Sequence, residues 1–335
     1  MDLALVWFLV IAFFWLGYLF LEGFDFGVGI LLPVLGRDET ERRVMVNTIG
    51  PVWDGNEVWL IVAVGATFAA FPGWYATLLS SAFLPLLAVL VGLIGRGVAF
   101  EFRGKVDSVR WRRNWDRVIV LGSWLPALGV GLLLSWNVLG LPIGVDGNRV
   151  GSPFAAFEWE TLLGALAVVG FSVVHGAVFV ALKTEGPIHS RARLLALRIG
   201  PLALLPLLGL LLLVQLRTGA SWTWFALGAS VVASAWALRR LAVGRDGQAF
   251  ALLALTIIGA VVTLFGALYP DVLPSTVDPA YSLTIEATAS SRYTLEVMTW
   301  FAALGAPAVL IYQGWTYWVF RKRIGTRHIP PVRVP

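Results

Sequence analysis

The sequence has no cysteine, few histidines and little charge, and each shortage excludes a class of protein or site. Without cysteine the chain forms no disulfide, no iron–sulfur cluster and no thiolate-ligated haem or zinc. Only three histidines and three methionines occur among its 335 residues. Charged residues make up 13% of the chain, against roughly 25% in soluble proteins. This composition is not that of a soluble protein.

Apolar segments take the place of the missing charge. Hydrophobic residues make up 58% of the chain, and apolar runs of about 20 residues recur along it. This pattern predicts an all-α polytopic membrane protein with nine transmembrane helices. We place them at residues 3–35, 53–71, 74–100, 114–139, 157–182, 192–216, 222–238, 250–269 and 293–320. An eight-helix alternative omits the short second segment, whose end is polar.

The basic residues predict how the chain is oriented. With nine spans, all but three of the 25 lysines and arginines lie on one side, and Arg149, Arg217 and Arg292 lie on the other. The positive-inside rule then places the N-terminus outside and the C-terminus in the cytoplasm. The eight-span alternative would move the arginines of residues 37–43 to the wrong side. The basic residues lie in short loops between spans, so they do not indicate nucleic-acid binding.

Two acidic motifs interrupt the first two apolar segments, EGFDFG at residues 22–27 and WDGNEVW at residues 53–59. A carboxylate at bilayer depth costs roughly 2.5–3.5 kcal/mol on insertion scales, which makes such residues functional candidates. The predicted orientation places all four carboxylates in the cytoplasmic half of the membrane. We therefore predict a proton path from the cytoplasm that uses Asp25, Asp54, Glu22 and Glu57, with Asn56 and Trp53 lining it.

The same residues also allow a structural interpretation. Carboxylates near helix ends reach interfacial water, or they pair with an arginine such as Arg96 and fix the helix register. Arg96, near the end of the third span, is itself expected to extend to the interface as a snorkelling cation. Only His175 lies within a span, because His189 and His328 lie in a basic loop and in the tail. We expect His175 to pack or to hydrogen-bond, so the chain is predicted to hold no haem and no metal.

The acidic motifs and the signals that follow them resemble subunit II of the cytochrome bd quinol oxidases. The resemblance covers essentially the whole chain in order, and the motif bracketed by Trp53 and Trp59 is its most distinctive part. Its further signals are RDETERR at 37–43, Arg96, FEFR at 100–103, RWR at 110–112, WD at 115–116, PS at 274–275, SLT at 282–284 and VMTW at 297–300.

The resemblance implies a single integral membrane domain of two four-helix bundles plus one peripheral helix. Bundle one would occupy about 1–140, bundle two and the last helix about 157–322, and a cytoplasmic tail 323–335. Such a subunit lies in the bacterial cytoplasmic membrane beside a subunit I that carries haems b558, b595 and d. The complex oxidises quinol, reduces dioxygen to water and generates proton motive force. This chain alone is not expected to be catalytic.

The resemblance also assigns roles by position. Asp54 would be the carboxylate of the proton path with Asp25 beside it, while Trp59 and Arg96 match positions along the family's proposed oxygen route. Glu57 occupies a position that can be an amide in relatives. Two other classes remain: a secondary transporter with proton-coupling carboxylates, and a scaffold that only stabilises a partner. The kind of quinone, a structural quinone in this chain, a small single-helix subunit and contacts with membrane lipid stay open.

Overall fold

The computed structural model describes residues 2–152 and 157–329, which fold into an all-α protein with one short β-hairpin. Residues 153–156, between the fourth and fifth predicted spans, and 330–335 of the predicted tail lie outside the described residues. The helices are α1 (Leu3–Leu35), α2 (Glu39–Ile49), α3 (Trp53–Ala70), α4 (Pro72–Ser81), α5 (Phe83–Phe102), α6 (Val109–Leu139), α7 (Trp159–Lys183), α8 (Pro187–Ala203), α9 (Leu205–Arg217), α10 (Thr223–Ala242), α11 (Asp246–Leu268), α12 (Ile285–Thr288) and α13 (Arg292–Val319). The short elements are β1 (Asp271–Leu273), η1 (Pro279–Tyr281), β2 (Leu283–Thr284) and η2 (Thr326–His328).

Seven helical stretches among the described residues are long and apolar enough to cross a membrane. They are α1, α5, α6, α7, the combined α8 and α9, α11 and α13. The second and seventh predicted spans do form helices, α3 and α10, but neither is among these seven. In α3 the polar side chains of Asp54, Asn56 and Glu57 lower the average hydropathy. The all-α prediction is confirmed, and the number nine stays a prediction.

Two predicted spans are wrong as single helices. The third, 74–100, is divided at Ala82 into α4 and α5, just before Pro85. Proline has no amide hydrogen to donate, and its ring clashes with the carbonyl four residues earlier, so it interrupts a helix. The sixth predicted span is divided at Leu204 in the same way, because Pro206 follows two residues later.

Helix α2 was not predicted, because its sequence was assigned to a charged loop. Asp38 caps the helix by accepting a hydrogen bond from the backbone N–H of Glu41 at 2.8 Å. Glu39 and Glu41 then lie in its first turn, where the helix dipole favours negative charge. The charged motif at residues 37–43 is therefore the start of a helix.

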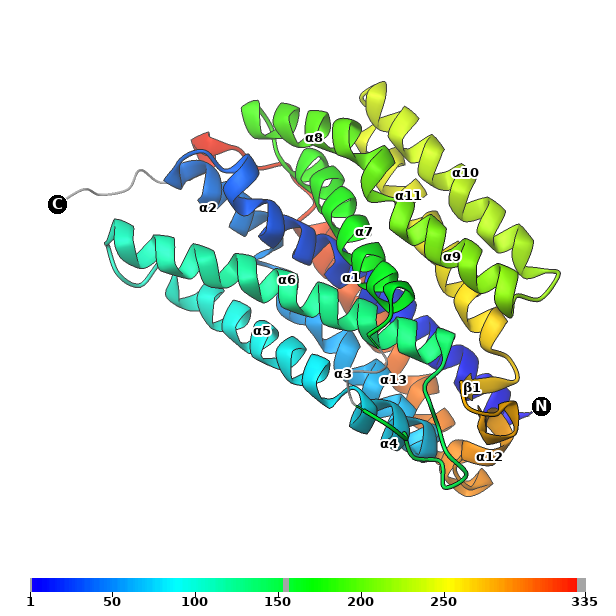
Figure 1. Ribbon diagram of the computed structural model, residues 1–335. Coiled ribbons are helices and arrows are strands. Elements are labelled where there is room, and N and C mark those ends of the chain that lie inside the picture. Colours follow the sequence, from blue (N-terminus) through cyan, green and yellow to red (C-terminus); the bar gives the residue numbers. More distant parts are fainter. Residues whose placement is uncertain (1, 153–156, 330–335) are drawn as a thin grey trace.

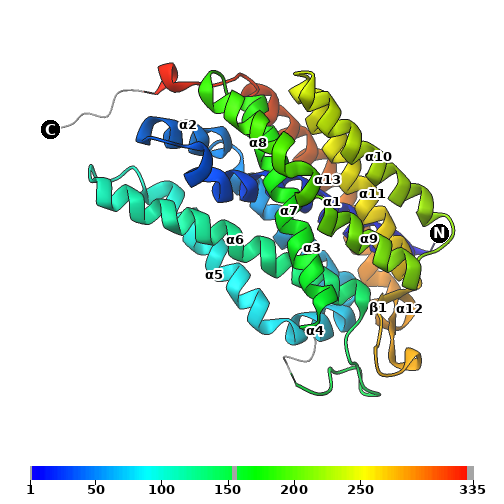
Figure 2. The ribbon, with the colours of Figure 1, turned by 45° about the horizontal axis from the view of Figure 1, so that its top comes forward.

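Helices α1 and α7 lie at the centre of the molecule, as Figure 2 shows. Helix α1 packs against α3, α6 and α7, and α7 also packs against α8, α9 and α11. Glycine permits this closeness: a Cβ atom on Gly27 would collide with the carbonyl oxygen of Ser172, and one on Gly176 would meet the Gly27 backbone. Helix α13 is peripheral. Only 6% of the residues in its 18-residue apolar stretch are buried, against 72% in the corresponding stretch of α7.

The two ends of the bundle carry different elements. Figure 1 places the N-terminal helix start, β1 and α12 at one end, and α2 with the segment that follows α13 up to residue 329 at the other. The tail is held there, because Arg323 donates to Asp246 at 2.8 Å and Ile324 forms a β-bridge with Thr184. The end with α2 also contains the basic connection from α5 to α6.

Candidate functional site

Arg96 of α5 lies between two carboxylates from neighbouring helices. It donates from Nη2 to Glu22 of α1, and the same nitrogen lies 3.2 Å from Oε2 of Glu57 of α3. The side chains of Arg96 and Glu22 are 0% exposed, and that of Glu57 is 23% exposed. The Arg96 guanidinium also lies 4.8 Å from the ring centre of Phe26, a cation–π contact.

The prediction that Arg96 snorkels to the interface is therefore wrong, and the alternative in which it pairs with a carboxylate is confirmed. Two carboxylates and an aromatic ring offset the cost of burying the guanidinium, which makes the interior preferable to the interface. The expectation that Glu22 reaches water from near the end of its span fails for the same reason.

A second group of polar side chains joins α1, α3 and α13. The Asn56 amide donates from Nδ2 to Oδ2 of Asp25 at 2.7 Å. Its carbonyl oxygen accepts from Nε2 of Gln313 at 2.9 Å and from the hydroxyl of Tyr317 at 2.7 Å. Sequence reasoning missed Gln313 and Tyr317. Their signal was present, since they are polar, lie one helical turn apart and interrupt the last apolar segment.

We call Glu22, Asp25, Asn56, Glu57 and Arg96 the buried cluster. Several of its polar atoms have no protein partner among the described residues. These are Oε2 of Glu22, Oδ1 of Asp25, Nε and Nη1 of Arg96 and the nearby hydroxyl of Tyr18. Buried polar atoms of this kind are ordinarily satisfied by ordered water. The buried cluster thus keeps hydrogen-bonding groups that the described side chains do not use.

Asp54 is exposed at the start of α3, three residues before Glu57 of the buried cluster. Asp25 accepts its hydrogen bond from Asn56, and no hydrogen bond joins it to Asp54 in the part of the chain that the structure describes. Trp53 is half-buried and packs on Phe100, with ring centres 5.2 Å apart. Trp59 is buried against α1, where its ring fills the space above Gly17.

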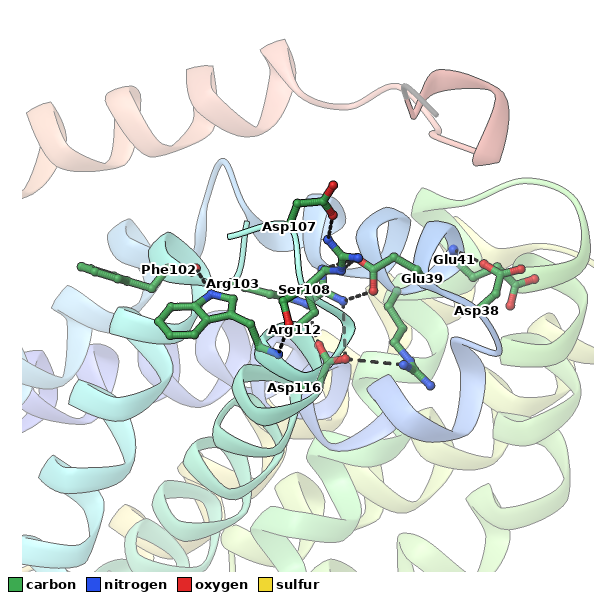
Figure 3. Close-up of polar contacts among 11 residues, drawn as sticks. Asp38, Glu39, Glu41, Phe102, Arg103, Asp107, Ser108, Arg112 and Asp116 are labelled. Atoms are coloured by element: carbon green, nitrogen blue, oxygen red, sulfur yellow. Dashed lines mark hydrogen bonds and ion pairs between the residues drawn. The ribbon is translucent and has the colours of Figure 1, made fainter. Parts of the chain in front are cut away.

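A second charged cluster lies where α2 meets the ends of α5 and α6, and Figure 3 shows it. Arg103 donates to Asp116 at 2.6 Å and through both terminal nitrogens to Glu39 at 2.9 Å. Burial lowers the pKa of Arg103, but these hydrogen bonds and charges outweigh it and raise the pKa above its usual value. Arg112 donates to Asp107 at 2.7 Å. The cluster ties α2 to the α5–α6 connection.

His175 does not fit the role of a haem ligand. Its ring stacks on Phe250 at 4.7 Å between ring centres and on Phe171 at 5.0 Å, so aromatic side chains cover both faces. Its Nε2 lies 3.0 Å from the carbonyl oxygen of Phe20. The packing role expected for His175 is confirmed. Among the described residues there is no group of three or more histidines and carboxylates arranged to hold a metal ion.

Comparison with known proteins supports one family. The model of the family described as cytochrome bd terminal oxidase subunit II matches residues 3–320. The chain belongs to this family. It is 39% identical over 324 residues to cytochrome bd ubiquinol oxidase subunit 2 of Bacillus subtilis, covering 95% of this chain and 96% of that one. It is 32% identical over 369 residues to cytochrome bd-I ubiquinol oxidase subunit 2 of Escherichia coli K12, covering 96% and 95%.

A solved bd oxidase shows the same fold. A chain in the structure of bd oxidase from Geobacillus thermodenitrificans superimposes with a TM-score of 0.79 at 20% sequence identity. The match covers 96% of this chain and 100% of that one. Membership of the subunit II family, together with the apolar helices, makes this chain an integral membrane protein of an oxidoreductase complex. It favours the oxidase interpretation over the transporter.

Proposed function

We propose that this chain is the haem-free subunit II of a cytochrome bd-type quinol oxidase in the bacterial cytoplasmic membrane. In this complex quinol is oxidised, dioxygen is reduced to water and proton motive force is generated. Haems b558, b595 and d belong to the partner, subunit I, and supply the electron transfer and the oxygen chemistry. The names of the relatives, which are subunits of ubiquinol oxidases, support this proposal. The chain itself supplies a proton path and stabilises its partner.

The proposed topology has nine transmembrane helices, with the N-terminus outside and the C-terminus in the cytoplasm. Helices α3 and α10 are the two that complete the nine. The pairing of α1, α3, α5 and α6 on one side, and of α7 with α8 to α11 on the other, supports two four-helix bundles in a single domain. Helix α13 is then the peripheral helix. We propose that the first bundle occupies about 1–140, the second bundle and the last helix about 157–322, and a tail 323–335.

The proton path begins at the exposed Asp54 and leads to the buried cluster. Glu22 and Glu57 share one arginine, so the ionic group carries a net negative charge when both carboxylates are ionised. Buried net charge is costly, and one proton on either carboxylate removes it. The cluster can therefore hold a proton between the surface and the interior. Asn56 donates to Asp25 through an amide, which positions that carboxylate but does not itself relay protons.

The partner covers the face that α3 and α13 share. Asp54 is exposed on α3, and a carboxylate facing lipid would be costly, so this face requires a protein or water partner. Large apolar side chains are also exposed on these two helices, among them Ile61 of α3 and Phe301 of α13. Their exposure fits an interface with subunit I.

An apolar groove of about 490 Å³ supports an oxygen route near Trp59. It lies between α1, α3 and α13 and is lined by Trp59, Phe14 and Met298. Dioxygen partitions into apolar surroundings, so such a groove suits its passage. Arg96 does not line the groove, because it points into the buried cluster. We therefore assign the oxygen route to Trp59 and the ionic role to Arg96.

The position of Asp54 on an exposed face, next to residues that enter the buried cluster, is the observation that carries the proton path. Asp54→Asn should slow quinol-driven oxygen consumption by at least about tenfold, since it removes a proton carrier while keeping the size of the side chain. Haem content should stay normal. The matched control is Glu101→Gln, which neutralises an exposed carboxylate at the end of α5. Unchanged turnover in Asp54→Asn would support the scaffold interpretation and would refute the role of Asp54 in the proton path.

A further inference from the structure

A groove lined by arginines lies outside the buried cluster and the proposed partner face. It is formed by the end of α1, by α2 and by α6, and its volume is about 510 Å³. Pro33 and Leu121 line its apolar part, and Arg42, Arg113 and Arg117 line its charged part. We call it the arginine groove. Neither the proton path nor the oxygen route uses it.

The arginine groove crosses the membrane boundary. Arg117 is the last charged residue of α6 before an uncharged, mostly apolar stretch that runs from Val118 to the end of the helix at Leu139. Leu121 is one turn deeper, and Arg113 is one turn nearer the basic end. The helix rise separates Arg113 from Leu121 by about 12 Å along the axis. The groove thus spans the depth of a lipid headgroup and the first carbons of its chains.

The charge of the groove is not balanced by the protein. Asp116 accepts from Arg103 at 2.6 Å and lies 3.6 Å from Arg42, so its carboxylate is already shared. Figure 3 shows Asp116 directed toward the cluster of α2 and Arg103. Arg113 and Arg117 are exposed, and neither forms an ion pair within the described ranges 2–152 and 157–329. Two cations therefore face an open groove at the membrane boundary.

We propose that the arginine groove binds an anionic phospholipid, with its phosphate between Arg113 and Arg117 and an acyl chain along Leu121. Charge complementarity favours an anionic headgroup, because basic grooves on the cytoplasmic side of membrane proteins attract anionic lipids. The apolar part favours a lipid over a free phosphate, since Leu121 is 60% exposed and an acyl chain would cover it. The lipid bridges α1, α2 and α6, and so stabilises the corner where α2 leaves α1.

The test uses the intact, delipidated complex in detergent. Bound lipid is measured by native mass spectrometry, and thermal stability is measured by heating the complex with each probe. The probes are phosphatidylglycerol, phosphatidylcholine and glycerol 3-phosphate. Phosphatidylglycerol should bind and stabilise the complex, and the other two should not. In Arg113→Gln/Arg117→Gln the binding should weaken about 25-fold, at roughly fivefold for each arginine. Oxygen consumption is recorded on the same samples, so that effects on lipid and on turnover are read separately.

Two variants serve as controls. Lys105→Gln/Arg110→Gln removes the same charge from exposed residues of the same connection, outside the groove, and should bind phosphatidylglycerol as the wild type does. Arg113→Lys/Arg117→Lys keeps the charge and should retain most of the binding. The proposal is overturned if phosphatidylcholine binds as tightly, if glycerol 3-phosphate alone reproduces the stabilisation, or if the double glutamine variant binds phosphatidylglycerol like the wild type.

Discussion

Substitution of Arg96 by glutamine removes the cation that Glu22 and Glu57 share. Glu22 is fully buried, so it would be left as a carboxylate without a counter-charge beside a second carboxylate. Breaking a buried ion pair from one side costs about 3–5 kcal/mol, because the remaining charge stays desolvated. Glu22→Gln is milder, since Arg96 then pairs with Glu57 alone and the group is neutral. It should cost about 1 kcal/mol, the net value of a hydrogen bond.

The double variant Glu22→Gln/Arg96→Gln separates these contributions. It removes the fully buried carboxylate together with the arginine, so it should be more stable than Arg96→Gln alone. A coupling of about 0.5–3 kcal/mol is typical of residues in one ionic network. The assay heats the detergent-solubilised complex and follows the amount that remains intact by size-exclusion chromatography.

A loss of 1 kcal/mol lowers the temperature at which half of the complex remains intact by roughly 2 °C. Arg96→Gln should therefore lower this temperature by about 6–10 °C, and Glu22→Gln by about 2 °C. Arg110→Gln is the control, because Arg110 is exposed and lies outside the cluster. Equal losses in Arg96→Gln and Glu22→Gln would refute the reasoning, since they would mean that the guanidinium compensates no buried charge. A double variant less stable than Arg96→Gln would refute it as well.

Two other substitutions test packing at the centre of the molecule. Gly27→Ala should destabilise the complex by about 1–3 kcal/mol, because the new methyl group meets the Ser172 backbone, whereas Gly228→Ala on α10, with open space around it, should be neutral in the same heating assay. His175→Ala should leave every haem band of the reduced-minus-oxidised spectrum in place while lowering thermal stability, since it removes a stacked ring and its hydrogen bond to Phe20. Loss of a haem band would contradict the packing role of His175.

The sequence was sufficient for the features that depend on local composition. Apolar runs predicted most helices, and α1 has the predicted bounds because a long, mostly apolar run leaves the backbone no other way to satisfy its hydrogen bonds in a membrane. The motifs at residues 22–27 and 53–59 identified the family that the comparison confirmed. The breaks at Ala82 and Leu204 were foreseeable from the prolines that follow them, but the continuous apolar composition concealed them.

Tertiary structure decided which polar groups meet. Glu22 and Arg96 lie far apart in the sequence, and no local pattern shows that they share a site, so Arg96 was expected at the interface. Gln313 joins the site only because α13 packs beside α3. Asp54, by contrast, points outward from a helix whose other residues enter the cluster. Helix formation depends on the local sequence. The pairing of buried charges depends instead on the distances between helices, and these distances are set only when the helices pack together.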